Sequence, residues 1–344
     1  MGRGGRRGGS GPLTDAPLAA PGAAVGRSGR VALWGRGLRR SVLPVVAVVA
    51  ALLAVWALAC LPMNAHQAVL EAERDGATIV PATAAERRDL SGWAILLRNP
   101  GTAAARAWTQ ERPRLPGPHQ VAAELWDGVA GTRITSKRSL VHHAGITLAP
   151  TLLGFAIGAG LGIALAVGIV HSRVMDLSVM PWAIASQTVP ILAIAPMIIV
   201  VLNSVGVQGL LPKAIISAYL SFFPVCVGMV KGLRAPTAAE LDLMRTWNAS
   251  PLRTLLSLRL PASLPYLFAS LKIAVAAALV GAIVGELPTG AVSGLGARLL
   301  AGSYYGQTIQ IWSALFAAAI VAAGLVGLLA VMERAVLGRM GLAR

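Results

Sequence analysis

The sequence predicts an all-α, polytopic transmembrane helix bundle of about six spans, on three observations. Of the 344 residues, 56% are hydrophobic and 13% are charged, whereas soluble domains carry about 25% charged residues. The charges gather in a few stretches between long apolar runs, because an ionisable group at the centre of a bilayer costs roughly 3 kcal/mol or more. The net charge of +16 comes with only 5% aromatic residues, which favours contact with anionic lipid over nucleic acid.

The first 62 residues contain a tail and a first span. Residues 1–40 are rich in Gly, Pro, Ala and Arg without apolar periodicity, so we predict a disordered, basic, cytoplasmic tail. Residues 41–62 are uncharged and long enough to cross about 30 Å of hydrocarbon. Two other interpretations are a secretory signal peptide and a lipoprotein signal that ends at Cys60. The run is longer than the roughly 7–15 apolar residues of a signal peptide, and further spans follow, so a transmembrane helix is favoured.

Residues 63–142 are the one stretch of soluble character, with interspersed charges and Pro-rich pieces. The stretch is long for a loop and short for an independent core. We predict an extracytoplasmic insertion that contains one short helix over 120–129. Beyond it, residues 143–335 are predicted to form a five-helix core and residues 336–344 a cytoplasmic tail.

The predicted core consists of apolar runs separated by loops. Proline removes a helical hydrogen bond, so the prolines at 181, 190 and 196 predict that the second run is kinked or broken. Small residues recur in the first run, which suits close helix packing. They are Gly154, Gly158, Gly160 and Gly162. The predicted spans cover residues 143–170, 180–202, 211–230, 264–284 and 308–331.

The distribution of Lys and Arg orients the chain. With a cytoplasmic N-terminus, the short inner loops are 171–178 and 231–263, and both carry cations. The short outer loops, 203–210 and 285–307, contain one cation, Arg298. Because cytoplasmic loops are enriched in Lys and Arg, we predict that both termini are cytoplasmic.

The inner loop over 231–263 mixes charged and apolar residues and is punctuated by prolines. Apolar residues recur at every third position from Leu241 to Trp247, which predicts a short amphipathic helix on the cytoplasmic face. This helix is predicted to end before Pro251, because proline disfavours helical geometry in the preceding residue. A second short helix is then expected to reach a turn at Leu260–Pro261. One interpretation is a helix that lies on the lipid surface.

The same loop resembles the cytoplasmic coupling loop of permease subunits in binding-protein-dependent ATP-binding-cassette (ABC) importers. That motif is an acid, two small residues, three residues, a glycine, nine residues, an aliphatic residue, one residue and Leu-Pro. In this chain the motif positions, in order, are Asp242, Leu243, Met244, Asn248, Leu258, Leu260 and Pro261. The chain departs from the motif by a shorter acid, a bulky pair and an asparagine for the glycine. Asparagine tolerates the left-handed conformation, so we expect the turn to be preserved.

The resemblance extends over residues 116–335 and implies the fold of a type I ABC importer permease in a bacterial inner membrane. The phrases at 260–272 and 280–289 are similar to the branch that serves nitrate, sulfonates, taurine, riboflavin and thiamine-precursor pyrimidines. The family implies three kinds of protein partner: an ABC ATPase subunit, an extracytoplasmic solute-binding protein and a second permease copy, expected to form a homodimer. The solute is expected to be a heterocycle of the vitamin type or a sulfonate- or nitrate-type anion.

Catalysis is not expected on this chain. The sequence contains no phosphate loop of the GxxxxGK[ST] type, so ATP is expected on the ATPase subunit. It shows no Ser/His/Asp set and no metal cluster, and we predict no cofactor or metal site here. The resemblance assigns ATPase coupling to Glu240, Asp242, Leu243, Met244, Arg245, Trp247, Asn248, Ala249, Leu258, Leu260 and Pro261.

Polar residues in or beside the predicted spans are candidates for the translocation pathway. Most intramembrane Ser and Thr side chains instead bond helix backbone, and that interpretation stays open here. Lys272, two turns into its span, is expected to snorkel to the cytoplasmic surface. The pathway candidates are Gln187, Thr188, Ser221, Ser270 and Glu286. For Glu286, at the outer end of its span, a helix cap and a contact with the binding protein are the alternatives.

Two other functions compete with the importer. An ion-coupled secondary transporter or channel would need an acid in the middle of a span or an inverted repeat, and the sequence contains neither. A membrane scaffold or receptor would use residues 63–142 as its working domain, although that stretch has no recognisable motif.

Overall fold

The computed structural model describes residues 27–288 and 291–341, and every regular element within them is helical. The chain divides into two compact units, Met1–Val55 and Trp56–Arg344. Helix α1 (Arg27–Arg74) begins in the first unit. Residues 27–40 are therefore helical, which corrects the expected disordered tail. Once an apolar helix has nucleated, each further residue extends it at little cost. The rest of the predicted tail, residues 1–26, lies outside the described residues.

Up to six apolar spans occur in the part of the chain that the structure describes, which confirms the predicted polytopic bundle. The sixth span is a bent pair, α7 (Arg173–Ser186) and α8 (Ile191–Ser204), with a bend of 98°. The predicted break lies at Pro190, which caps α8. The five single helices long and apolar enough to cross a membrane are Leu43–Arg74, Leu140–His171, Leu210–Leu233, Pro251–Glu286 and Thr308–Arg339.

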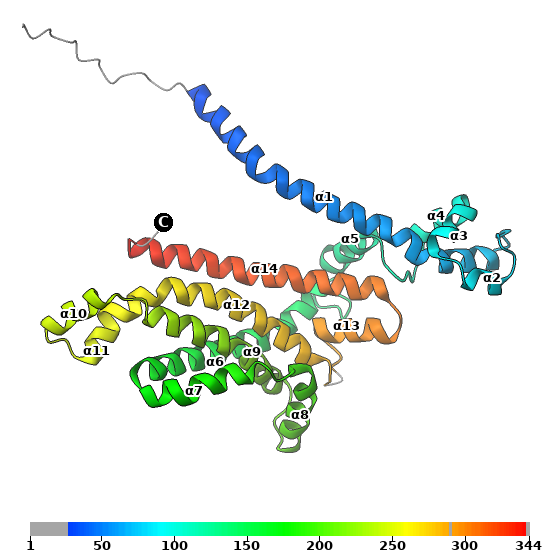
Figure 1. Cartoon of the computed structure of the whole chain (residues 1–344). Coiled ribbons are helices and arrows are strands. Elements are labelled where there is room, and N and C mark those ends of the chain that lie inside the picture. The colour runs from blue at the N-terminus through cyan, green and yellow to red at the C-terminus, as the bar shows by residue number, and fades with distance from the viewer. Residues whose placement is uncertain (1–26, 289–290, 342–344) are drawn as a thin grey trace, which may run out of the picture. The chain divides into compact units, whose positions relative to one another are not determined.

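Helix α9 (Leu210–Leu233) packs between α6 (Leu140–His171) and α12 (Leu260–Glu286), as Figure 1 shows. The α6–α9 contact is close because a Cβ added to Gly154, Gly158 or Gly162 would lie 2.6 Å or less from α9 atoms. Gly160 meets nothing within 4 Å, so it does not belong to the predicted packing row. It lies two residues from Gly158 and therefore on the opposite face of the helix.

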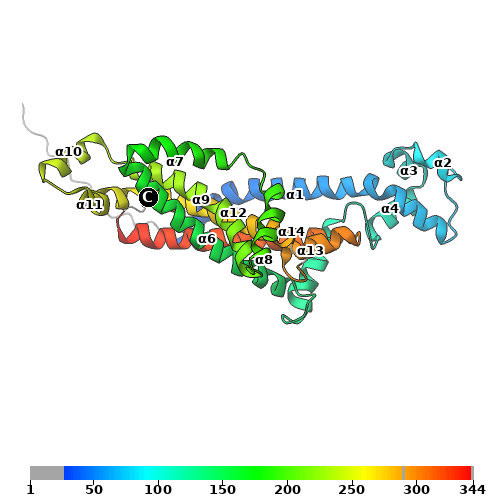
Figure 2. The same ribbon diagram turned by 90° about the horizontal axis from the view of Figure 1, so that it is seen from below.

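A second layer covers α12. Helix α14 (Thr308–Arg339) lies along α12, and the short α13 (Leu295–Tyr304) precedes it at one end of the bundle (Figures 1 and 2). Trp56 of α1 stacks on Trp312 and Phe316 of α14, with ring centroids 5.0 and 5.8 Å apart. Aromatic side chains of this kind gather where a membrane meets water.

The predicted insertion is a folded module, which we call the helical cap (residues 64–115). Its helices α2 (Ala84–Arg88), α3 (Gly92–Arg98) and α4 (Pro100–Thr109) fold against the last turns of α1. A small apolar core joins α1, α3 and α4, so a stretch that is long for a loop and short for an independent core folds on the end of α1. The buried core residues are Ala65, Val69, Ala72, Ile79, Ile95, Leu96 and Ala103.

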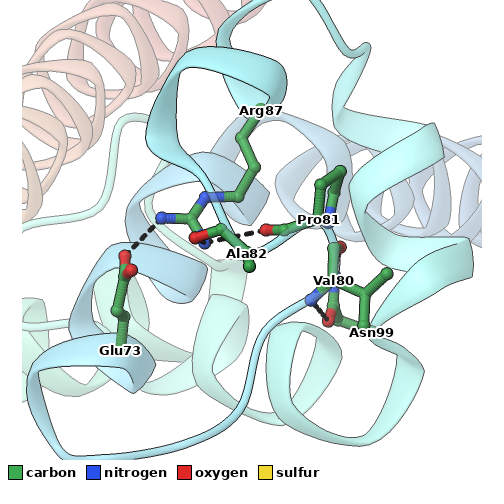
Figure 3. Close-up of polar contacts among 6 residues, drawn as sticks. All are labelled: Glu73, Val80, Pro81, Ala82, Arg87 and Asn99. Carbon is green, nitrogen blue, oxygen red and sulfur yellow. Dashed lines mark hydrogen bonds and ion pairs between the residues drawn. The ribbon is translucent and has the colours of Figure 1, made fainter.

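Two buried polar side chains hold the connections of the helical cap (Figure 3). Nη1 of Arg87 donates to the carbonyl oxygens of Pro81 and Ala82 at 3.0 and 3.3 Å, and Nη2 pairs with Glu73. Asn99 bonds the backbone of Val80 in both directions, accepting from its N–H at 2.9 Å and donating to its carbonyl at 2.7 Å. These bonds satisfy loop backbone groups that would otherwise be buried without partners.

The short helix predicted over 120–129 is present. It consists of α5 (Pro118–Trp126) and a following π-helical turn, η1 (Asp127–Gly131). Gly117 precedes Pro118 at the first helical position, where proline is tolerated because that N–H has no helical partner. Helix α5 packs on α14.

Candidate functional site

The predicted amphipathic helix of the inner loop is α10 (Ala238–Thr246). A capping box fixes its start: Thr237 Oγ1 accepts from the Glu240 N–H at 3.3 Å, and Glu240 Oε2 accepts from the Thr237 N–H at 2.7 Å. This reciprocal pair satisfies two N–H groups that a helix start leaves open. The Thr237 backbone N–H and hydroxyl both stabilise the ionised carboxylate, and they lower the pKa of Glu240.

The end of α10 explains the asparagine at the motif's glycine position. Asn248 has φ of 49°, the one positive value among non-glycine residues in the described part of the chain. Its N–H bonds Arg245 O at 2.9 Å, and the Ala249 N–H bonds Met244 O at 3.0 Å. This is the Schellman pattern, in which a left-handed residue closes a helix. The expectation that asparagine preserves the turn is confirmed.

Helix α10 projects from one end of the bundle and buries none of its residues (Figure 1). Leu243 and Trp247 are 50% and 68% exposed, four residues apart and therefore on one face. Asp242 and Arg245 form an exposed ion pair at 2.8 Å beside them. Met244 and Ala249 are half-buried, and Glu240 and Asn248 are exposed. The result is a small, rigid, partly apolar surface with charged edges.

The coupling segment (residues 231–263) runs without a turn into the membrane helix. Helix α11 (Pro251–Thr254), a π-helical turn η2 (Leu255–Arg259) and α12 form one helix of 36 residues, Pro251–Glu286. The turn expected at Leu260–Pro261 is therefore wrong. Pro261 has no N–H to donate, and the wider π turn just before it accommodates this defect. Leu258, Leu260 and Pro261 are half-buried.

Several contacts join the coupling segment to the same end of the bundle, which we call the coupling end. Nη1 of Arg259 donates to Leu233 O, at the end of α9, at 2.9 Å. Arg234 pairs with Asp176 of α7 at 2.9 Å. Leu255 and Leu260 pack on the buried cluster that contains Met229. These contacts hold the coupling segment against α7 and α9.

The five pathway candidates do not form one site. Gln187 and Thr188 are exposed at the break between α7 and α8. Ser221 is buried in the α6–α9 contact, where its Oγ donates to Gly154 O at 3.4 Å. Ser270 is buried opposite Gly228 and bonds Leu267 O at 2.9 Å. The two serines thus sit in helix contacts, where the alternative interpretation of backbone bonding applies.

Glu286, the fifth candidate, is fully buried at the other end of α12. Thr147 of α6 donates its hydroxyl to Oε1 at 2.9 Å, and the Gly296 N–H donates to Oε2 at 2.7 Å. The carboxylate therefore caps the N-terminus of α13, where negative charge is favoured by the helix dipole. A Cβ on Gly294 would lie 2.4 Å from the carboxylate, so this glycine makes room for it.

Sequence reasoning missed the partners of Glu286. Thr147 also accepts from the Leu295 N–H at 2.9 Å, and Nδ1 of His143 accepts from the Gly294 N–H at 2.9 Å. These side chains come from a helix about 140 residues earlier in the chain. Gly294 and Gly296, which follow Glu286 in the sequence, are the one local signal that could have indicated the arrangement.

Lys272 also differs from expectation. Its Nζ pairs with Oε2 of Glu333 on α14, and the two side chains are 28% and 21% exposed. The Lys272 charge is therefore compensated by a carboxylate of the bundle, in addition to any reach toward the membrane surface.

The fold and the projecting amphipathic helix define a helical membrane permease, and comparison with known proteins identifies the family. Residues 158–340 match the binding-protein-dependent transport system inner membrane component family. The chain belongs to that family. It is a multi-pass membrane protein and a permease subunit of an ABC importer, a family that works with an ATPase and a solute-binding protein. The prediction made from the coupling-loop resemblance is confirmed.

Relatives support the predicted branch. A probable ABC transporter permease protein of Haemophilus influenzae is 36% identical over 181 residues, 53% of this chain and 69% of that protein. The formylaminopyrimidine transport permease protein of Halalkalibacterium halodurans is 31% identical over 182 residues, 53% of this chain and 68% of that protein. The riboflavin transport system permease protein of Chloroflexus aurantiacus is 29% identical over 220 residues, 64% of this chain and 78% of that protein.

Proposed function

We propose that this permease imports a small solute by seating α10 in a groove of a separate ABC ATPase subunit. ATP binds and is hydrolysed on that subunit, and this chain supplies no catalytic group and no cofactor site. The solute is a vitamin-type heterocycle or a sulfonate- or nitrate-type anion, the classes named for its relatives. Closure of the ATPase pair pushes α10, and the helix switches access across the membrane as a rigid-body movement.

The observation that carries this proposal is the exposed face of α10. Leu243 and Trp247 offer apolar side chains that are half or more exposed, and buried aromatic anchors dominate the energy of protein interfaces. The helix is closed at both ends by its own caps, so it is preorganised for docking and loses little conformational entropy on binding.

We further propose that both termini and the coupling segment face the cytoplasm of a bacterial cell, with the helical cap outside. The short loops at the coupling end carry the cations, as cytoplasmic loops do. A cytoplasmic position is required if α10 is to meet an ATPase.

Two copies of the chain are proposed to form the pathway between them. The break at Gln187 and Thr188 leaves polar side chains and unwound backbone exposed within a span. Lipid cannot satisfy such groups, which occur at membrane depth only against protein or water. A two-fold partner and a water-filled pathway meet that requirement, and lipid surrounds the remaining apolar faces.

The proposed docking of α10 on the ATPase subunit is tested by measuring how much ATPase co-purifies with the permease. Tagged wild-type permease is expected to co-purify with its ATPase, and Trp247→Asp should reduce that retention at least about tenfold, because one interface anchor is worth about 2 kcal/mol or more. Leu97→Asp changes a still more exposed apolar residue of the helical cap and should leave retention unchanged. Full retention and ATP-dependent uptake in the double variant Asp242→Arg, Ala249→Trp would overturn the proposal.

The closing turn of α10 offers a finer test. Asn248→Gly should keep or improve ATPase retention, because glycine adopts positive φ without strain. Asn248→Ala should weaken retention, because a left-handed conformation costs a residue with Cβ about 1 kcal/mol. Equal retention in the two variants would show that the turn does not position the helix.

A further inference from the structure

Helices α6, α9 and α12 interlock into one block. On one side of α9, Gly158 faces Ser221; on the other, a Cβ on Gly228 would lie 2.4 Å from Ser270, and one on Gly232 2.8 Å from Ser263. Such contacts leave no space for one helix to slide past another, since packed interiors do not deform continuously. The three helices are therefore expected to move together when α10 is displaced.

Helix α14 contacts this block unevenly. Its buried residues are Ser313, Ala314, Ala317, Ala318 and Leu329. Four of these five lie in the first turns after Thr308, far from the coupling end. Near the coupling end, Leu328, Val331 and Met332 are exposed. Ala314, Ala317 and Ala318 pack with Ile283 of α12 in an apolar cluster at the far end, and nearer the coupling end the buried residue of α14 is Leu329.

Two polar contacts hold α12 at different points along its length. At the far end, Glu286 bonds Thr147 of α6 and Gly296 of α13, and α13 leads into α14. Near the middle of α12, Lys272 forms a partly buried ion pair with Glu333, which lies in the last turns of α14. Removing one member of such a pair leaves the other charge poorly solvated. The two side chains therefore either stay in contact or separate only where water can enter and solvate both charges.

We propose that Lys272 and Glu333 are positioning residues that form a latch, which closes the coupling end when the complex holds no ATP and opens when ATP draws α10 aside. The inference rests on the proposed seat of α10 on an ATPase. In this account, the Glu286 contacts act as the fixed point and the α6–α9–α12 block as the lever. The latch sets how readily the ATPase pair can close.

The lever lengths agree with this role. Pro251 lies about 52 Å and Lys272 about 21 Å along the helix from Glu286, at 1.5 Å per residue. A movement of about 5 Å at Pro251 therefore shifts Lys272 by about 2 Å, since the displacement scales with distance from the fixed point. That shift is enough to take an ion pair out of contact, which ends near 4 Å.

Basal ATP hydrolysis by the purified permease–ATPase complex tests the latch without knowledge of the solute. Lys272→Met and Glu333→Gln should each raise hydrolysis without binding protein by about three- to tenfold, because the state that resists closure is less favoured. Lys272→Arg should stay near the wild-type rate. The double variant Lys272→Glu, Glu333→Lys should return toward it, which a merely structural loss would not do.

Matched controls separate the latch from general damage. Asp75→Asn breaks the ion pair between Asp75 and Arg106 in the helical cap and spares α12 and α14, so its hydrolysis rate should not change. Wild-type rates in both Lys272→Met and Glu333→Gln, or no recovery in the exchanged double variant, would overturn the latch. If the proposed function itself is wrong, the α10 variants will retain the ATPase. If only the latch is wrong, the α10 variants will still lose the ATPase.

A cross-link gives a second readout. With the buried Cys60 and Cys226 replaced by alanine, the variant Lys272→Cys, Glu333→Cys should react with a short bis-methanethiosulfonate to form a cross-link in the nucleotide-free complex, because two long side chains in contact leave their Cα atoms too far apart for a direct disulfide. It should do so at least about tenfold more slowly when ATP and vanadate trap the closed ATPase, since the pair is then apart. Equal cross-linking in the two states would show that α12 and α14 do not separate there.

Discussion

Three glycines of α6 set how near it comes to α9. Gly154, Gly158 and Gly162 lie four residues apart, and each faces backbone or side-chain atoms of α9 that leave no room for a methyl group. The sequence predicted that this row would pack closely, because small residues let membrane helices approach. It wrongly placed Gly160 in the row, although helical periodicity puts a residue two positions from Gly158 on the opposite face.

The glycine row yields a prediction with an internal control. Gly158→Ala should destabilise the protein by about 1–3 kcal/mol, because its Cβ would lie 2.7 Å from the rigid carbonyl of Ala218. Gly160→Ala, which faces open space, should be neutral or stabilising by up to about 1 kcal/mol, since alanine favours helix. Thermal unfolding in detergent measures both; equal melting temperatures would contradict the packing.

Asn248 and Glu286 differ in how far sequence could explain them. The role of Asn248 depends on a turn between neighbouring residues, so the spacing of the motif was enough to predict its left-handed backbone. The role of Glu286 depends on Thr147, which is 139 residues away. Sequence reasoning found an acid at a membrane boundary and proposed the pathway. A helix cap was among the alternatives, but the sequence alone could not identify α13 or Thr147 as the partner.

At the scale of elements, patterns predicted where helices are more reliably than where they stop. Apolar runs predicted the spans, and the three prolines predicted the break before α8. The failures lie at ends: α1 begins before the apolar run and continues beyond it, and no turn occurs at Leu260–Pro261. A π turn removes the conflict between Pro261 and a continuous helix, and nothing in local composition indicates a π turn.

The helical cap gives a prediction at this scale. Arg87→Met should destabilise the helical cap by about 1–3 kcal/mol, because the carbonyls of Pro81 and Ala82 lose their donor. Arg88→Met, an exposed neighbour on the same short helix, should have no effect. Limited proteolysis of the connection between α1 and α2 measures the difference. Equal cleavage rates in the two variants would mean that the buried arginine does not hold the connection.

For the whole molecule, the distribution of charge predicts which end faces the cytoplasm. With the two native cysteines replaced by alanine, Leu97→Cys in the helical cap should react with a membrane-impermeant maleimide on cells with a permeable outer membrane. Leu252→Cys in the coupling segment should react only after the inner membrane is opened, because short cationic loops stay inside. The reverse pattern would invert the chain and exclude any ATPase contact.

The helical cap enters and leaves at almost the same point. The Asn64 side chain accepts from the Leu115 N–H at 3.0 Å and donates to the Leu115 carbonyl at 2.8 Å. One side-chain amide thus joins the first and last residues of the helical cap. The roughly fifty residues between these two points lie outside residues 158–340, the stretch that matches the family. Such a module can be excised or grafted in evolution without rerouting the chain, and a short linker would bridge the gap that it leaves.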